Sequence, residues 1–237
     1  MREIFSIPPE AIRPDIGAVL RAQGVPPDAP LSARTERMAV EAIRMMDDEG
    51  RPVALFEEVT RADFAAAYAG EGMNEPETPL DRIEPVAEDR ALFALTLGQA
   101  VCDRIAALFD GGDPALGAML DAAASEAADR AVTAVEARFR ERLDRERGED
   151  PARHVLAYSP GYCGWHVSAQ RRLFTRLRPE EIGIRLRESF LMDPLKSVSG
   201  ALLSGPARIH RFEARYPFCR GCRDRTCRDR IAALGDD

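Results

Sequence analysis

Two stretches of this chain bring together residue types that suit ligand binding. The first, residues 158–166, reads Tyr-Ser-Pro-Gly-Tyr-Cys-Gly-Trp-His, and we call it the glycine loop. The second, Glu188–Gly200, reads Glu-Ser-Phe-Leu-Met-Asp-Pro-Leu-Lys-Ser-Val-Ser-Gly, and we call it the serine segment. Loops rich in glycine, proline and serine expose backbone N–H and C=O groups and let a ligand approach the main chain closely. The two stretches are therefore predicted to form a ligand site.

The glycine loop holds two aromatic side chains whose roles the sequence leaves open. Pro160 and Gly161 predict a tight turn, with Gly161 at positive φ. Trp165 is the only tryptophan and is either a packing anchor for the loop or a wall beside a planar cofactor. Tyr162 either hydrogen-bonds a ligand or caps the core.

Three of the five cysteines, Cys219, Cys222 and Cys227, lie close together near the C-terminus. A Cys-x2-Cys pair places two thiolates within reach of one metal ion, and a third thiolate after four intervening residues can close on the same centre. Cys163 of the glycine loop is the natural fourth ligand. A redox-active dithiol and simple thiols on a basic tail are the alternatives. Cys102 has apolar neighbours and is predicted to be a small buried residue.

The two stretches together resemble the reactivation domain of cobalamin-dependent methionine synthase. The resemblance lies in Pro160-Gly161-Tyr162 and in the pattern Glu-Ser-Phe-x-Met-x-Pro-x-x-Ser-Val-Ser-Gly from Glu188 to Gly200, in the same order and at a compatible separation. It covers roughly residues 90–210 and implies an α+β fold, a twisted antiparallel sheet flanked by helices. The expected order of elements favours the same class, because the predicted strands are separated by helices early in the chain and lie closer together later.

The resemblance also implies a cofactor site. In that family the first loop contributes to a site for S-adenosylmethionine, on a surface that faces bound cobalamin. By position, Gly161 and Tyr162 would lie beside the S-adenosylmethionine. Further candidates for the same site are Tyr158, Trp165, Glu126, Glu188, Ser189, Ser197 and Ser199. Glu126 is among them because the resemblance places the long helix near the site; a solvated helix face is the alternative.

One departure from the family pattern bears on that cofactor. The family's S-adenosylmethionine-binding arginine lies four positions before the motif glycine, where this chain has Ala157. A guanidinium there would hold a carboxylate through two charge-assisted hydrogen bonds. Arg153 is a nearby arginine, but nothing in the sequence directs it to the site. Binding of S-adenosylmethionine is therefore left open by the sequence.

The predicted function follows from the resemblance. It is reductive reactivation of a corrinoid methyltransferase, in a split methionine synthase system, by reduction of cob(II)alamin and remethylation from S-adenosylmethionine. The chain has no Asp-x-His-x-x-Gly pattern, so we expect the cobalamin on a separate corrinoid-binding partner, with an electron donor such as a flavodoxin or ferredoxin. Because this reduction needs an electron at low potential and zinc has no redox chemistry, a [4Fe–4S] cluster is preferred over zinc at the four cysteines.

Two alternatives remain, and they leave open whether the chain is an enzyme. One is a non-catalytic docking or electron-delivery subunit that bears a metal or an iron–sulfur cluster and does not bind S-adenosylmethionine, which Ala157 favours. The other is a different S-adenosylmethionine-dependent methyltransferase, which the lack of a glycine-rich nucleotide loop after a strand makes less favoured.

Size and charge bound the remaining possibilities. The 237 residues are enough to bury one sizeable core. Residues 1–150 carry a net charge of −14 and residues 151–237 of +7, an asymmetry that suits an anionic ligand or acidic partner. The overall charge of −7, without a basic stripe interleaved with aromatics, argues against nucleic acid. No apolar run reaches about 18 residues and the N-terminus lacks a secretory pattern, so we expect a cytoplasmic protein without membrane contact.

Periodicity and capping signals predict the elements that position these residues. The helices are expected at 15–23, 32–49, 60–69, 99–109, 113–147 and 166–178. The strands are expected at 52–59, 91–97, 181–187, 197–203 and 208–212. The acidic stretch 70–90, rich in glycine and proline, predicts a boundary between an N-terminal extension (1–80) and a core (81–212), followed by the cysteine-containing tail (213–237). Lys196, the only lysine, is expected at the surface.

Overall fold

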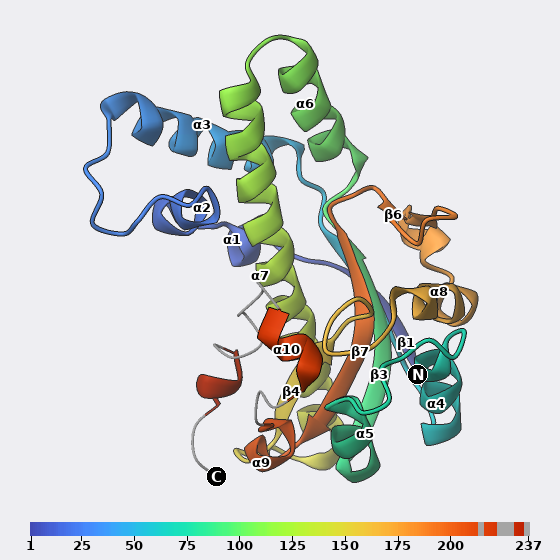
Figure 1. Ribbon diagram of the computed structural model, residues 1–237. Helices are drawn as coiled ribbons and strands as arrows, with labels where there is room; N and C mark the ends of the chain where they lie inside the picture. The colour runs from blue at the N-terminus through green and yellow to red at the C-terminus, as the bar shows by residue number, and fades with distance from the viewer. Residues whose placement is uncertain (213–215, 222–229, 235–237) are drawn as a thin grey trace.

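The structure is a computed structural model that describes residues 1–212, 216–221 and 230–234. Its centre is a five-stranded antiparallel sheet with the strand order β1-β2-β3-β7-β4 (Figure 1). The strands of this sheet are β1 (Arg2–Ser6), β2 (Val53–Glu58), β3 (Asp89–Thr96), β7 (Ser197–Gly205) and β4 (His154–Tyr158). A separate two-stranded ribbon pairs β5 (Arg185–Leu186) with β6 (Met192–Asp193).

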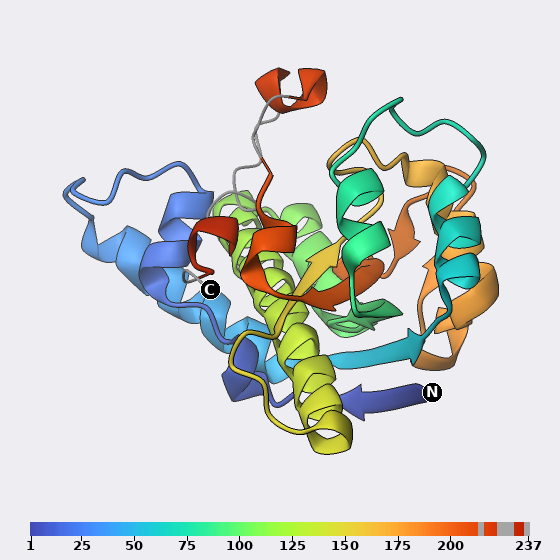
Figure 2. The ribbon, with the colours of Figure 1, turned by 90° about the horizontal axis from the view of Figure 1, so that it is seen from below.

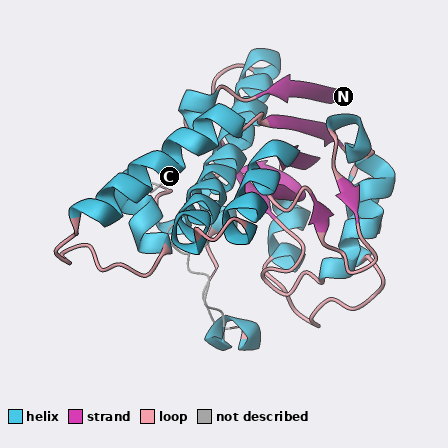
Figure 3. Cartoon of the chain, turned by 90° about the horizontal axis from the view of Figure 1, so that it is seen from above, coloured by secondary structure: helices cyan, strands magenta, loops and turns pink. Residues whose placement is uncertain are grey.

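Helices cover both faces of the sheet, as Figures 2 and 3 show. On one face lie α1 (Pro9–Ile12), α2 (Ile16–Ala22), α3 (Ala33–Glu49), α6 (Gln99–Asp110) and α7 (Pro114–Arg147). On the other lie α4 (Arg61–Ala69), α5 (Leu80–Ile83), η1 (Glu84–Val86), η2 (Val167–Ala169), α8 (Gln170–Leu177) and η3 (Pro179–Ile182). The described C-terminal residues add α9 (Ala207–His210) and α10 (Pro217–Gly221). Within the described ranges, no helix combines the length and apolar character needed to cross a membrane.

The sheet alternates its side chains between two hydrophobic cores, as a strand with period two must. On β3, Phe93 and Leu95 face the α7 layer, whereas Leu92 and Ala94 face the α4 and α8 layer. The α7 side of the core is lined by small residues, among them Ala123, Ala127 and Ala131, none of which has exposed surface. Such small side chains let the long helix pack closely against the sheet.

Capping hydrogen bonds are present at the starts of three helices that the sequence predicts. The Ser32 hydroxyl accepts a hydrogen bond from the Thr35 N–H at 3.1 Å at the start of α3. Thr60 and Asp63 form a reciprocal capping box at the start of α4. Asp113 accepts from the Leu116 N–H, and α7 then runs from Pro114 to Arg147 as predicted.

The strand prediction was wrong or incomplete at five places. The strands β1, β4 and β6 were not foreseen, because each is short and lies beside a turn-rich stretch. The strand expected at 181–187 is reduced to Arg185–Leu186, since Pro179 opens a 3-10 turn that ends at Gly183 with φ +82°. The strand expected at 208–212 is instead the helical turn α9, Ala207–His210.

The N-terminal 80 residues share the sheet with the rest of the chain. Glu57 of β2 lies opposite Arg2 of β1, and Phe56 lies opposite Phe93 of β3. The segment expected as an N-terminal extension thus supplies two adjacent strands to the same sheet that carries the glycine loop and the serine segment.

Candidate functional site

The glycine loop and the serine segment meet on neighbouring strands. Tyr158, the last residue of β4, lies opposite Ala201 of β7. At Gly200, next to Ala201, an added Cβ would overlap the carbonyl oxygen of Tyr158 and approach the Ser159 hydroxyl at 3.0 Å. Only glycine lets the two strands pass this closely, so the last residue of the second motif fixes where the glycine loop begins.

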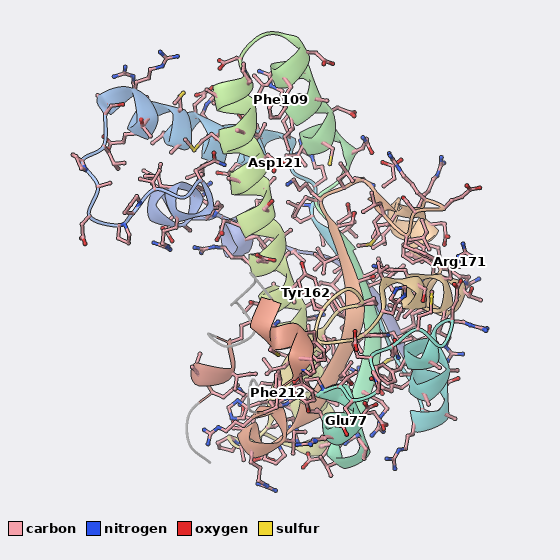
Figure 4. The ribbon with its side chains drawn as sticks, in the orientation of Figure 1. Glu77, Phe109, Asp121, Tyr162, Arg171 and Phe212 are labelled. Carbon is pink, nitrogen blue, oxygen red and sulfur yellow. The ribbon has the colours of Figure 1, made fainter. Side chains whose placement is uncertain are left out.

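The glycine loop is a closed turn with one open side. The Gly161 N–H donates to the Trp165 carbonyl at 2.7 Å, and the Trp165 N–H donates to the Tyr162 carbonyl at 3.0 Å. Gly161 has φ +94°, as the sequence predicted, and an added Cβ there would meet no atom within 4 Å. Tyr162 beside it exposes 52% of its surface and lies in front of the sheet (Figure 4).

Trp165 anchors this turn from the inside. Only 1% of its surface is exposed, and its ring packs at 5.6 Å from the Tyr68 ring and at 6.4 Å from the Phe64 ring. Its position is that of a packing anchor, one of the two roles the sequence left open, and the indole does not line an open surface.

Two residues of the stretch 70–90, where the sequence predicts a domain boundary, hold the glycine loop in place. The Asn74 side-chain oxygen accepts from the His166 N–H at 2.9 Å, while its amide donates to the Tyr68 carbonyl at 2.8 Å. The Glu75 N–H donates to the Gly164 carbonyl at 3.0 Å. These supporting residues could not be found from the sequence, because nothing in the local pattern of residues 70–79 names the loop as their partner.

The serine segment divides into an exposed tip and a buried base. Glu188 and Ser189 are exposed between β5 and β6. Ser197 is buried, and its hydroxyl donates to the Pro194 carbonyl at 2.7 Å and lies within hydrogen-bonding distance of the Thr96 hydroxyl at 2.9 Å.

Ser199 is buried as well and donates to the Gln170 side-chain oxygen at 2.6 Å. The two motif serines therefore tie β7 to its neighbours, and of the four polar residues predicted in this segment only Glu188 and Ser189 face solvent.

Lys196 connects the serine segment to the long helix. Its ammonium donates to the Ser125 hydroxyl at 2.8 Å and to the Asp121 carbonyl at 3.0 Å, and it pairs with the Asp121 carboxylate at 2.9 Å. The side chain is only 12% exposed, so the surface role expected for Lys196 was wrong. Glu126 follows Ser125 and is half-buried on this part of α7, close in sequence to the contact.

Tyr158 is turned into the protein. Its ring is buried, and its hydroxyl lies 2.9 Å from the His210 Nδ1 of α9. Burial lowers the pKa of His210 to about 4, so the imidazole is neutral at physiological pH. The pair joins the start of the glycine loop to the C-terminal residues.

Ala157 is held by two charged side chains that the sequence did not point to. Its N–H donates to the Glu136 carboxylate of α7 at 2.6 Å. Arg230 donates to the Ala157 carbonyl at 3.4 Å and also pairs with Glu136. Burial raises the pKa of Glu136, whereas the charge of Arg230 opposes that shift. Arg153, the nearby arginine considered from sequence, is instead buried against Asp144.

The structure describes only some of the cysteines that the sequence singles out. Cys163 lies in the glycine loop with φ +52°, and Cys219 lies on α10. Cys222 and Cys227 fall outside the described residues. Phe218, next to Cys219, approaches the glycine loop: an added Cβ at Gly164 would lie 2.8 Å from its ring. Among the residues that the structure does describe, no three His, Cys, Asp or Glu side chains gather as metal ligands.

A hollow of about 600 Å3 lies between the stretch that contains Glu75 and the C-terminal stretch that contains Phe218. One wall comes from residues 75–77, 82 and 83, and the other from residues 209, 211, 212 and 216–218, which include Phe212 and Phe218. Figure 4 shows Phe212 and Glu77 at this part of the molecule, below Tyr162.

Comparison with known proteins agrees with this geometry. Residues 91–214, more than half of the chain, match the family described as vitamin B12 dependent methionine synthase, activation domain. Among solved structures, the crystal structure of the MetH reactivation domain bound to AdoHcy is similar, with a TM-score of 0.62 and 18% sequence identity over 87% of this chain and 79% of that chain. No curated protein matches the chain. The expected α+β fold, an antiparallel sheet flanked by helices, is therefore confirmed, and the chain belongs to the family of vitamin B12 dependent methionine synthase activation domains.

Proposed function

We propose that this chain reactivates a corrinoid methyltransferase by receiving the cobalamin of a partner protein against the glycine loop. Family membership supports the role, and one observation carries the placement. The turn is open at Gly161 and exposes Tyr162, while its base is fixed by Trp165 and Asn74. A turn that is already rigid and exposed can meet a large planar group with little ordering cost.

The proposed reaction is one-electron reduction of cob(II)alamin followed by transfer of a methyl group from S-adenosylmethionine, which leaves AdoHcy. The similar MetH domain was crystallised with AdoHcy, which supports a site for the same class of ligand here. In this chain the open side of Gly161 leaves room for a ligand against the main chain, and Tyr162 supplies a phenol at its edge. The task of these residues is to orient the methyl donor toward the cobalt.

The surroundings of the loop suit protein partners. Leu191 and Leu195 of the serine segment are 54% and 60% exposed, which supplies apolar surface for a corrinoid-binding protein. The net charge of +7 over residues 151–237 suits an acidic electron donor such as a flavodoxin or ferredoxin.

Replacement of Tyr162 tests the docking surface. We expect Tyr162→Ala to slow methylcobalamin formation about tenfold, because the exposed ring no longer orients the ligand. The measurement is visible absorbance of a cob(II)alamin-loaded corrinoid protein mixed with this chain, a reductant and S-adenosylmethionine. Tyr162→Phe distinguishes the ring from the hydroxyl. The control is Phe109→Ala, a comparably exposed aromatic near the C-terminal end of α6 and distant from Tyr162 (Figure 4). An unchanged rate in Tyr162→Ala refutes this placement.

A second candidate function is a metal-bearing docking or electron-delivery subunit that does not bind S-adenosylmethionine. Two observations favour it. Both backbone groups of Ala157 are already bonded, to Glu136 and Arg230, and no arginine projects from that position. Phe218 also brings the helix that carries Cys219 beside the loop that carries Cys163.

Metal analysis of anaerobically purified protein tests this second candidate. A [4Fe–4S] cluster predicts about four iron atoms per chain in the wild type, falling to trace in Cys163→Ser and unchanged in the matched variant Cys102→Ser. Zinc in place of iron would make the site structural. Iron and zinc both at trace in the wild type would remove the candidate. Calorimetric titration with S-adenosylmethionine separates the two functions, since only the first predicts heat of binding.

A further inference from the structure

The C-terminal residues contact the glycine loop at both of its ends. Arg230 reaches the residue before it, Ala157, and Phe218 reaches Gly164 near its end. Both contacts come from residues beyond the stretch that matches the family, 91–214. They are therefore features of this chain that family membership does not explain.

The contact at Ala157 closes an open sheet edge. The strand β4 is the last of the sheet, so one side of it has no neighbouring strand. There the Glu136 carboxylate accepts from the Ala157 N–H, and the Arg230 guanidinium donates to the Ala157 carbonyl. A buried carboxylate is costly without a partner, and Arg230 is the cation that pairs with it. The contact thus couples the C-terminal residues to the base of the glycine loop.

The contact at Gly164 covers one side of the loop. The Phe218 ring stacks on Tyr216 with ring centres 5.2 Å apart, and its edge lies against the Gly164 backbone. The side chains of Glu75 and Thr78, which precede α5, would each lie 3.0 Å from a Cβ added at the same glycine. Gly161, three residues earlier, has open space on its outer side. The C-terminal residues therefore cover one flank of the loop and leave the other flank open.

We propose that Phe218 and Arg230, through their contacts at Gly164 and Ala157, form a latch at the two ends of the glycine loop and compete with ligands and partners that use it. The latch regulates the site assigned above, so its functional consequence rests on the proposed function. In the latched state part of the loop is covered. A ligand that needs the covered flank can bind only to unlatched molecules. Its apparent affinity is therefore the intrinsic affinity multiplied by the fraction of molecules that are unlatched.

Trp165 supplies a readout of the latch that needs no ligand. It is the only tryptophan, it is buried, and it follows Gly164 directly. We expect acrylamide quenching of its fluorescence to increase about threefold in Phe218→Ala and in the double variant Glu136→Gln/Arg230→Met, because each variant removes one of the two contacts of the latch. The glutamine keeps an acceptor for the Ala157 N–H and avoids an unpaired buried charge. Arg34→Met, at an exposed arginine of α3, is the matched control.

The outcomes separate cleanly when circular dichroism shows that each variant is folded. Unchanged quenching in both latch variants overturns the latch, and an increase in only one of them shows that the two contacts do not act together.

Calorimetry with AdoHcy then tests the functional consequence. The dissociation constant of AdoHcy is expected to be about tenfold lower in both latch variants than in the wild type. If quenching rises but no variant binds AdoHcy, the latch stands and the proposed S-adenosylmethionine site fails. If the latch variants bind AdoHcy with the wild-type affinity, the proposed competition between the latch and AdoHcy is overturned.

Discussion

Gly200 is the residue at which the two sequence motifs constrain each other. The carbonyl of Tyr158 occupies the space that any side chain at this position would need. The adjacent motif residue Ser199 is bonded inside the protein to Gln170. At this scale the serine segment acts as a support that places the glycine loop, and the solvent-facing chemistry lies at Gly161 and Tyr162.

Substitution of Gly200 tests this role. We expect Gly200→Ala to lower the free energy of unfolding by about 3 kcal/mol, because the methyl group can be admitted only if β4 and β7 move apart. For a chain of this size that corresponds to a fall in the thermal midpoint of roughly 6–12 °C.

The control is Gly205→Ala on the same strand. There the added methyl meets the end of the flexible Ile209 side chain, which can turn aside. A loss at Gly205 as large as that at Gly200 would contradict the steric explanation.

At the scale of elements, the stretch between α4 and α5 supports the glycine loop through hydrogen bonds. Asn74 and Glu75 bond the loop through His166 and Gly164, while Asn74 is also bonded to the end of α4 through the Tyr68 carbonyl. The same α4 presents Tyr68 and Phe64 to Trp165. One helix and the stretch that follows it therefore fix both the inside and one flank of the turn.

Asn74 should be needed for the rigidity of the loop. In Asn74→Ala the His166 N–H loses its acceptor, and we expect a loss of about 2 kcal/mol in the free energy of unfolding. Amide exchange of residues 161–166 should also become faster, which hydrogen–deuterium exchange measures by mass spectrometry. Asn74→Asp keeps the acceptor and loses only the donor to Tyr68, so its loop should exchange more slowly than that of the alanine variant. Equal exchange in both would show that the Asn74 acceptor does not order the loop.

At the scale of the whole molecule, one sheet joins parts that are far apart in the sequence. Its two outer strands, β1 and β4, come from residues 2–6 and 154–158; α7 packs against β4 and reaches β1 through the ion pair of Arg138 with Glu3. The glycine loop leaves the sheet at the β4 edge, where β4 has no further strand beside it. At this edge Arg230 donates to the Ala157 carbonyl, so the proposed latch and the proposed docking surface share one edge of the protein.

The sequence by itself determined the elements whose signals are local. Capping residues and apolar periodicity placed α3, α4, α6 and α7, and the motif spacing identified the glycine loop and the serine segment. These predictions succeeded because a helix cap or a positive-φ glycine depends on residues a few positions apart. The positive φ of Gly161 is such a case.

Only the tertiary structure decided which of the predicted site residues face solvent. Tyr158, Trp165, Ser197 and Ser199 are buried, whereas Tyr162, Glu188 and Ser189 are exposed. The structure also supplied partners that no local pattern names, such as Arg230 for Glu136, 94 positions apart. The physical reason is that burial and ion pairing depend on where distant strands and helices pack, and a sequence pattern with a period of a few residues carries no record of that packing.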